Sequence, residues 1–335
     1  MGEQHLLEVE NLSTSFTTED GLVRAVSDVS FHVDRGEVLA VVGESGSGKS
    51  VMAMSLMRLL PKNAIITGWA SFEGRDLLSL SEYEMRKIRG RGMAMIFQDP
   101  MTALNPVFTV GNQIAEAVRV HQSVSKPLAM KRAVELLDLV GIPEPGQRVD
   151  SYPHEFSGGM RQRAVIAMAI SNDPQLLIAD EPTTALDVTI QAQVLEVIVT
   201  VQRATGAAML LITHDLGLVA GVADRVQVMY GGRVFESGDT RDVYYGGKNP
   251  YTRALMRSVP RLDERTSDRL SSVPGTPPSL IRLPSGCVFW PRCEFSEQIC
   301  RTTEPALIQC GTDHVSRCHF ATTLPEFEYG ARLGA

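Results

Sequence analysis

The chain has 335 residues, enough for two domains, one of which can bury a sizeable core. Its 39 acidic and 32 basic side chains give a formal charge of −7, so no basic surplus indicates nucleic acid as the main partner. The longest apolar runs are far shorter than the roughly 18 residues that a membrane-spanning helix needs. The polar N-terminus does not resemble a secretory signal, and we therefore expect a cytoplasmic protein.

The first part of the chain predicts a small sheet that leads into a glycine-rich loop. Short β-like runs at Leu6–Val9 and Val29–Val33 are separated by turn signals. Phe16 lies between them, where its ring could stack on a purine or pack within the sheet. A buried strand is expected at Val38–Val42, and a helix at Met52–Leu60.

Between that strand and that helix, residues 43–50 read GESGSGKS, which fits the phosphate-loop pattern G-x-x-x-x-G-K-S. The glycines allow successive backbone N–H groups to face an anion. Lys49 supplies a charge for the β- and γ-phosphates, and the Ser50 hydroxyl can ligate Mg²⁺. The alternative is a Gly/Ser-rich turn that matches by accident. The nucleotide contacts expected from this loop are Gly43, Ser45, Gly46, Gly48, Lys49 and Ser50.

The middle of the chain predicts a helical insertion into an α/β core. A turn-rich polar loop begins at Gln98, and apolar residues then recur at helical spacing from Val110 to Gly141, which fits two amphipathic helices. The insertion ends at Phe156–Arg163, and a nearly all-apolar helix is expected at Ala164–Ile170.

Two later apolar strands end in polar side chains. Leu176–Ala179 is followed by Asp180 and Glu181, at the sheet edge where ligands of open α/β sheets bind. Asp180 is suited to hold Mg²⁺, and Glu181 to orient or deprotonate a water that attacks the γ-phosphate. Ala208–Ile212 leads similarly to His214, within expected reach of the same phosphate. The alternatives are a solvated strand end and a structural histidine.

Together with Ser157-Gly158-Gly159, these motifs resemble the nucleotide-binding subunit of an ATP-binding cassette (ABC) transporter over about residues 6–255. The resemblance implies an α/β P-loop NTPase fold: a RecA-like core with an antiparallel β subdomain and a helical subdomain at about 98–160, in a domain of residues 1–255. The matching motifs are Walker A at 43–50, the Q-loop at Gln98, the signature at 156–162, Walker B at 176–180 followed by Glu181, the D-loop at 185–187, and the switch His214.

The resemblance also implies roles for individual residues. Glu181, His214 and Gln98 would be catalytic, and Ser50, Gln98 and Asp180 would surround Mg²⁺. Phe16 would contact ATP. Ser157 and Gly159 would bind the γ-phosphate of ATP held by another subunit. The signature departs from the family consensus at Phe156 and Met160, where Leu and Gln are usual, but the phosphate-facing residues are kept.

Segments 97–106, 152–163, 249–255, 258–263 and 283–287 further resemble the oligopeptide and dipeptide permease branch of bacterial importers. This branch implies an ATPase that powers peptide import as a peripheral protein on the cytoplasmic face of the cell membrane. The implied partners are a second ATP-binding subunit in a heterodimer, two integral membrane subunits and an extracytoplasmic peptide-binding protein, with no nucleic acid. The alternative is a soluble ABC-type ATPase of DNA repair or translation, which a single cassette with a short insertion makes less favoured. The loop Asp99–Asn105 is expected either to dock on the membrane subunits or to be an ordinary surface turn.

All five cysteines lie between Cys287 and Cys318, which favours a metal site over disulfides in a chain without a secretory signal. The spacing C-x5-C-x6-C-x17-C lacks the C-x2-C pairs usual for structural zinc, and four thiolates suit either zinc or an iron–sulfur cluster. Unliganded buried thiols are a third reading. The resemblance favours a [4Fe–4S] cluster on Cys287, Cys293, Cys300 and Cys318, in a small C-terminal domain at 256–335. Cys310 is an alternative fourth ligand to Cys318.

Overall fold

The computed structural model describes residues 5–184, 187–258 and 273–327. The chain divides into two compact units. The first contains residues 1–7, 33–37 and 71–212, and the second contains residues 8–32, 38–70 and 213–335.

The first unit is built on parallel strands whose side chains are buried throughout. β6 (Met93–Ile96) pairs with β7 (Leu176–Asp180), which pairs in turn with β8 (Ala208–Thr213) up to Ile212, where the first unit ends. Continuous apolar runs are typical of parallel strands covered on both faces. The strands predicted from such runs are therefore confirmed.

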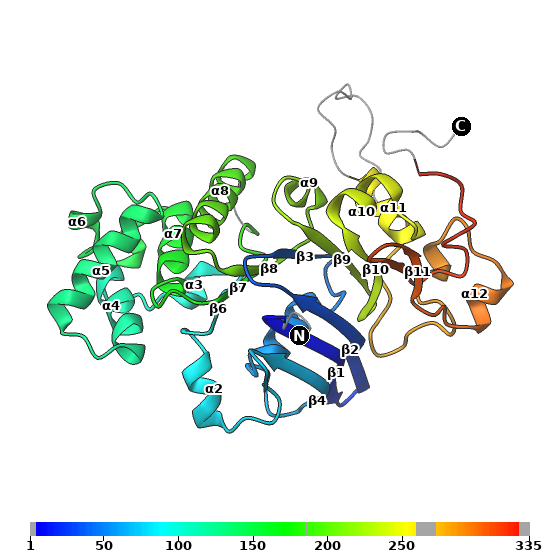
Figure 1. Ribbon diagram of the computed structural model, residues 1–335, viewed down its shortest axis with the longest axis horizontal. Coiled ribbons are helices and arrows are strands. Elements are labelled where there is room, and N and C mark those ends of the chain that lie inside the picture. Colours follow the sequence, from blue (N-terminus) through cyan, green and yellow to red (C-terminus); the bar gives the residue numbers. More distant parts are fainter. Residues whose placement is uncertain (1–4, 185–186, 259–272, 328–335) are drawn as a thin grey trace. The chain divides into compact units, whose positions relative to one another are not determined.

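Helices account for most of the rest of this unit (Figure 1). They are α2 (Glu82–Ile88), α3 (Pro100–Ala103), α4 (Val110–His121), α5 (Lys126–Leu139), α6 (Pro145–Arg148), η1 (Pro153–Glu155), α7 (Gly158–Ala169) and α8 (Val188–Thr205). The two amphipathic helices predicted between Val110 and Gly141 are confirmed as α4 and α5.

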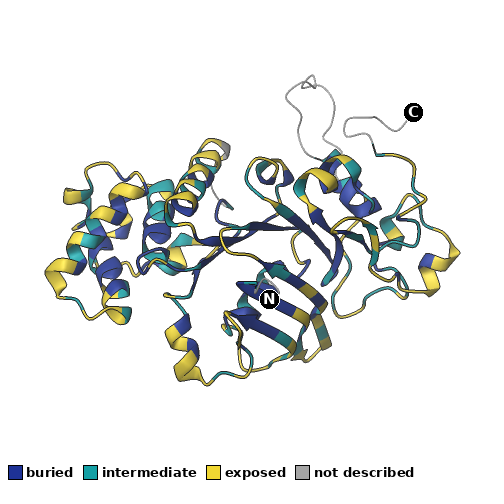
Figure 2. Ribbon diagram, viewed as in Figure 1, coloured by how far each residue is buried: buried dark blue, intermediate teal, exposed yellow. Residues whose placement is uncertain are grey.

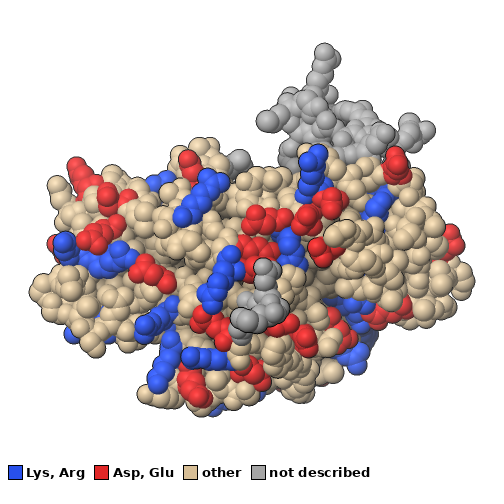
Figure 3. Space-filling view, viewed as in Figure 1, with Lys and Arg blue, Asp and Glu red and all other residues tan. Residues whose placement is uncertain are grey.

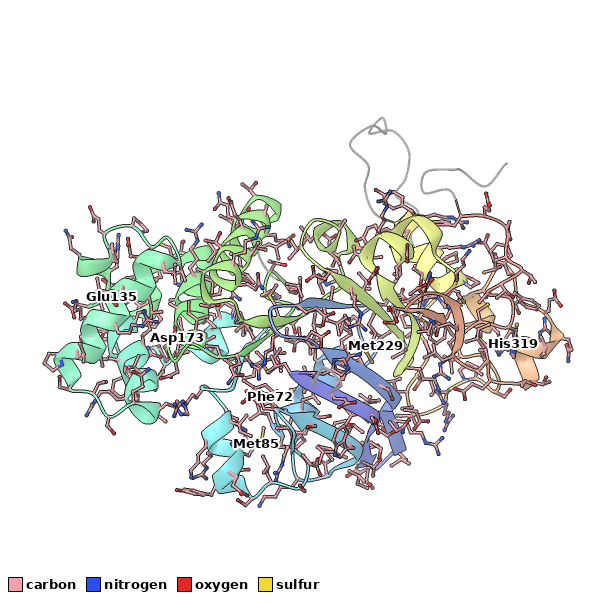
Figure 4. The ribbon with its side chains drawn as sticks, in the orientation of Figure 1. Phe72, Met85, Glu135, Asp173, Met229 and His319 are labelled. Atoms are coloured by element: carbon pink, nitrogen blue, oxygen red, sulfur yellow. The ribbon has the colours of Figure 1, made fainter. Side chains whose placement is uncertain are left out.

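α4 and α5 pack through small and branched apolar side chains and expose their opposite faces (Figure 2). Their contact contains Ala115, Val118 and Ala129. Outside that contact, Arg132 of α5 donates a hydrogen bond at 2.9 Å to Asp173, which is labelled in Figure 4. An apolar seam thus holds this helical part together, with ion pairs at its surface.

The second unit contains strands of two sheets. β2 (Gly21–Val33), β1 (Leu7–Thr18) and β4 (Ala64–Phe72) lie in that order in one sheet, and β5 (Arg75–Asp76) pairs with the end of β4 that belongs to the first unit. In the other sheet the order is β11 (Ile308–Gly311), β12 (His314–Ser316), β10 (Arg233–Asp239), β9 (Arg225–Tyr230) and β3 (Val38–Val42). The helices of this unit are α1 (Lys49–Leu56), α9 (Leu216–Val219), α10 (Thr240–Gly246), α11 (Pro250–Arg257), η2 (Trp290–Arg292) and α12 (Gln298–Thr302).

The strand before the phosphate loop and the C-terminal segment share this second sheet. β3 runs parallel to β9, with Val42 opposite Val228, and β9 turns into β10 through two glycines of positive φ. β12 then pairs antiparallel with β10, with Ser316 opposite Glu236. An aromatic cluster of Tyr230, Phe235, Tyr251 and Phe289 fills the core beside these strands. A domain boundary at residue 255 stays a prediction.

Among the described residues, no helix is long and apolar enough to cross a membrane. On the face shown in Figure 3, Lys and Arg side chains are interspersed with Asp and Glu side chains.

Candidate nucleotide site and cysteine cavity

The phosphate loop follows the fully buried strand β3, and its backbone lies close to the backbone of neighbouring residues. Gly43 has φ +155°, and a Cβ there would overlap the carbonyl oxygen of Met229, a residue labelled in Figure 4. Gly48 has φ +100°, and a Cβ there would overlap the carbonyl oxygen of Ala25. Both positions therefore require glycine, because of the backbone angle and because of the close approach.

The start of α1 suits a bound phosphate. Gly48 occupies its N-cap position, so no side chain caps the helix and its first N–H groups are left for an anion to bind. The Lys49 side chain is buried, and its Nζ donates to the carbonyl oxygens of Gly43 and Glu44 at 2.7 and 3.0 Å. The buried Ser47 hydroxyl has no hydrogen-bond partner among the residues that the structure describes. The loop therefore fits the phosphate group that its sequence predicts.

At the end of β7, two predicted catalytic side chains come together. Asp180 is buried, and Glu181 follows with φ +44°, in the left-handed region that few non-glycine residues adopt. Gln98 Nε2 donates to Glu181 Oε2 at 3.2 Å, and Thr184 Oγ1 donates to the same oxygen at 2.9 Å. The sequence reasoning missed Thr184. Its signal is a hydroxyl three residues after the carboxylate, within one turn of chain.

His214 and Phe16, which are also predicted nucleotide contacts, belong to the second unit, whereas Ser157 and Gly159 belong to the first. His214 is exposed and follows β8, the strand that pairs with β7. Phe16 is half-buried near the end of β1. The phosphate loop lies in this unit as well, whereas Gln98, Asp180 and Glu181 lie in the first.

The signature segment begins α7 six residues earlier than the predicted helix at Ala164. Ser157 is exposed and caps the helix, since its Oγ accepts the Met160 N–H at 3.3 Å. A Cβ at Gly159 would lie 2.8 Å from the Ile190 side chain of α8, so this glycine permits close packing. Phe156 is buried, an apolar anchor where the consensus has leucine. Ala185 and Leu186 of the predicted D-loop lie outside the described residues; Asp187 caps α8.

The C-terminal segment contains a cavity lined by four of the five cysteines and by several aromatic rings. His319, labelled in Figure 4, also lines it. The cysteines in the lining are Cys287, Cys293, Cys300 and Cys318. Cys310 is not in the lining; its Sγ faces the carbonyl oxygen of Ile308 instead. A backbone hydrogen bond joins two parts of the cavity wall that are separate in the sequence: the Cys287 N–H donates to the Cys300 carbonyl oxygen at 2.8 Å.

Burial changes the acidity of three of these thiols. It raises the pKa of Cys293 to about 12 and that of Cys318 to about 11, and it also raises the pKa of Cys287. As free thiols, these three would therefore be protonated at neutral pH. Metal ligation requires thiolates, so binding would release protons. Four convergent cysteines fit a four-thiolate ligand set.

The architecture matches solved ATP-binding cassettes. One is the dimeric ATP-binding cassette MJ0796 in a post-hydrolysis state bound to ADP and Pi, with a TM-score of 0.63 and 25% identity over 70% of this chain and 99% of that one. Another is cbiO1 from Clostridium perfringens, part of the ABC transporter complex cbiONQ, with a TM-score of 0.60 and 28% identity over 72% and 91%. The fold is thus the α/β cassette of the P-loop NTPases, as predicted.

Family comparisons narrow the class further. Residues 26–184 match the ABC transporter model, and residues 235–300 match the model of the oligopeptide/dipeptide transporter C-terminal region. The chain belongs to the ABC transporter family, in the branch that carries this C-terminal region.

Several proteins with similar sequences are named as ATP-binding proteins of peptide transport. The oligopeptide transport ATP-binding protein OppD of Bacillus subtilis is 51% identical over 92% of this chain and 87% of its own length. The dipeptide transport ATP-binding protein DppD of B. subtilis is 51% identical over 94% of each. OppD of Mycobacterium bovis is 54% identical over 93% of this chain but 51% of its own length, so the chain spans about half of that relative.

Proposed function

We propose that the chain is the ATP-hydrolysing subunit of a multisubunit ABC transporter that imports peptides. The observation that carries this proposal is a cassette joined, in one chain, to the C-terminal region of oligopeptide/dipeptide transporters. The names of the relatives above support it. They do not support the alternative of a soluble ATPase in DNA repair or translation.

In the proposed reaction, water attacks the γ-phosphate of ATP and ADP leaves. The phosphate loop would bind the phosphates through its backbone N–H groups and Lys49, while Phe16 stacks on the base. Glu181 would orient the water and accept its proton. Gln98, which donates a hydrogen bond to the Glu181 carboxylate, would help to place that carboxylate. His214 would contact the γ-phosphate.

A magnesium ion would neutralise charge on the phosphates. Its proposed ligands are the Ser50 hydroxyl, the Gln98 side chain and, directly or through water, Asp180. Ser50 lies in the first turn of α1, and Asp180 ends β7. Hydroxyl, amide and carboxylate oxygens are the ligand types that Mg²⁺ prefers.

We propose that two ATP-binding subunits enclose the nucleotides. Ser157 and Gly159 would bind the γ-phosphate held by the other subunit, which fits their position at the exposed start of α7. The similar cassette MJ0796 is dimeric with ADP and Pi bound. In a peptide importer the partner would be a second, different ATP-binding subunit.

The proposed location is peripheral, on the cytoplasmic face of the membrane, attached to two integral membrane subunits that an extracytoplasmic peptide-binding protein supplies. The loop Asp99–Asn105 is the proposed docking element. It contains α3, and its Met101 side chain is 57% exposed, as an apolar contact for a partner requires. Gln98 directly precedes this loop and donates a hydrogen bond to Glu181. Docking of a partner on the loop would therefore change the position of the Glu181 carboxylate.

For the cysteine cavity we propose a [4Fe–4S] cluster on Cys287, Cys293, Cys300 and Cys318, with a structural role. The four cysteines line one cavity, and four thiolates are the ligand set that such a cluster needs.

Affinity purification from detergent-solubilised membranes tests the transport function. We expect the chain to bring down two integral membrane proteins and a second cassette, with ATPase activity that rises when a peptide-loaded binding protein is added. Recovery with ribosomes or DNA, without membrane proteins, would overturn the proposal.

Anaerobic purification tests the cluster. We expect a brown protein that absorbs at about 400 nm and contains about four iron atoms per chain. A colourless protein with one zinc ion would contradict the cluster.

A further inference from the structure

Within the second unit, an ion pair joins the phosphate loop to residues 287–318, which contain the cavity cysteines and are called the cysteine segment here. Glu44 is the second residue of the loop, and Arg292 directly precedes Cys293. Arg292 Nη1 donates to Glu44 Oε2 at 2.6 Å, and Nη2 donates to Oε1 at 2.9 Å. Such a two-pronged contact between guanidinium and carboxylate is the strongest and most directional ion pair that proteins form.

Arg292 is held rigidly. Its side chain is 5% exposed, against 23% for Glu44. Nε donates to the carbonyl oxygen of Pro274 at 2.6 Å, Nη2 donates to that of Val273 at 3.0 Å, and Nη1 donates to the Tyr230 hydroxyl at 3.2 Å. All three nitrogens of the guanidinium are thus engaged. A side chain fixed in this way acts as an anchor for the loop, unlike a mobile surface arginine.

A second contact reaches the same loop residue through the aromatic cluster. The Glu44 N–H donates to the Tyr251 hydroxyl at 2.9 Å. The Tyr251 ring packs against Phe289, with centroids 5.2 Å apart, and Phe289 lies between Cys287 and Cys293 in sequence. The backbone and the carboxylate of Glu44 are therefore both held by residues packed against the cysteine segment.

The carbonyl oxygen of Glu44 is one of the two that Lys49 Nζ contacts. We infer that Arg292 is a positioning residue for the phosphate loop, through which the cysteine segment sets the affinity for ATP. This inference rests on the proposed function, since it requires that the loop bind ATP. The competing view is that the ion pair only fastens the C-terminal segment to the rest of the unit.

The test measures ATP affinity by equilibrium binding to the full chain, and KM and kcat in the assembled transporter. The variants are Arg292→Gln, Arg292→Lys, Glu44→Gln and the double variant Arg292→Gln/Glu44→Gln. We expect the Kd and KM for ATP to rise about fivefold or more in both glutamine variants, with kcat at saturating ATP within about twofold of wild type. The double variant should be no weaker than Arg292→Gln, because both changes remove one interaction. Arg292→Lys should recover part of the affinity.

The matched control is Arg257→Gln. Arg257 pairs with Glu294 at 2.7 Å, so it also binds the cysteine segment, next to Cys293, but it does not contact the phosphate loop. We expect wild-type affinity from it. If Arg292→Gln does not fold, Glu44→Gln decides alone, since it leaves the arginine in place.

Wild-type affinity in both Arg292→Gln and Glu44→Gln, additive losses in the double variant, or an equal loss in Arg257→Gln would overturn the inference. Failure of the wild-type chain itself to bind ATP would instead refute the proposed function, so the two failures are distinguishable.

Discussion

Glu181 combines a rare backbone conformation with two hydrogen-bond donors on one oxygen, from Gln98 and Thr184. Glu181→Gln keeps the size and backbone of this residue but removes the carboxylate that accepts a proton from water. We therefore expect turnover to fall by about 10² or more while ATP binding is kept. Phosphate release from the assembled transporter and equilibrium ATP binding measure the two effects.

Glu196→Gln is the matched control for that change. Glu196 is an exposed carboxylate on α8, so its variant should hydrolyse ATP at the wild-type rate. Near-normal hydrolysis by Glu181→Gln would refute the catalytic role.

Two glycines of the phosphate loop should respond differently to alanine. Both have positive φ, +100° at Gly48 and +77° at Gly46, but only at Gly48 would a Cβ overlap another atom, the carbonyl oxygen of Ala25. Gly48→Ala adds this overlap to the backbone strain, so it should destabilise the fold by about 1–3 kcal/mol and by more than Gly46→Ala. Thermal unfolding of both variants without nucleotide is the measurement. Equal melting temperatures would show that the close approach costs nothing.

At the scale of whole elements, the sequence predicts fully buried strands better than partly exposed strands or helix starts. β1 (Leu7–Thr18) and β2 (Gly21–Val33) extend well beyond the predicted runs at Leu6–Val9 and Val29–Val33. β3 and β7 agree with their predicted bounds, because a continuous apolar run between polar residues leaves one reading. α7 begins before its predicted start, because two glycines suggest a loop while the Ser157 cap permits a helix. α1 likewise begins at Lys49 instead of Met52, directly after the left-handed Gly48.

The candidate site shows the same division. Motif spacing names Gln98 and Glu181, and the structure brings their side chains together. Motif spacing does not name Arg292, because its partner Glu44 is 248 positions away in the sequence and no local pattern links the two residues. Pairing of β12 with β10, which carries the C-terminal segment, is equally non-local. Long-range contacts of this kind depend on tertiary packing and leave no periodic trace in the sequence.

The C-terminal segment has few regular elements, so its cysteines are expected to hold it together. Cys293→Ala removes a thiol from the cavity, and Cys310→Ala removes one outside it. We expect Cys293→Ala to lose the brown colour and most of its iron, and Cys310→Ala to keep both. Iron content after anaerobic purification is the measurement. Full iron in Cys293→Ala, or its loss in Cys310→Ala, would reassign the ligands.

On the scale of the whole molecule, the proposed ATP site needs a second subunit. Ser157 caps α7 with its hydroxyl and is exposed at the helix start, where it can meet a phosphate held by another chain. The isolated chain should therefore hydrolyse ATP slowly, and its activity should rise when the partner cassette and the membrane subunits are added. Steady-state phosphate release at each stage of assembly measures this.

Ser157→Ala distinguishes a contribution across the subunit interface from one within the chain. If Ser157 serves the partner's nucleotide, the variant chain should bind ATP at its own phosphate loop with unchanged affinity, yet the assembled transporter should lose activity. Ser125→Ala is the control, because Ser125 also precedes a helix but makes no capping hydrogen bond through its side chain. The lost cap should cost Ser157→Ala about 1 kcal/mol of stability, too little to unfold the chain and so too little to explain an inactive transporter. A lone chain that is as active as the complex, or a fully active Ser157→Ala transporter, would contradict the shared site.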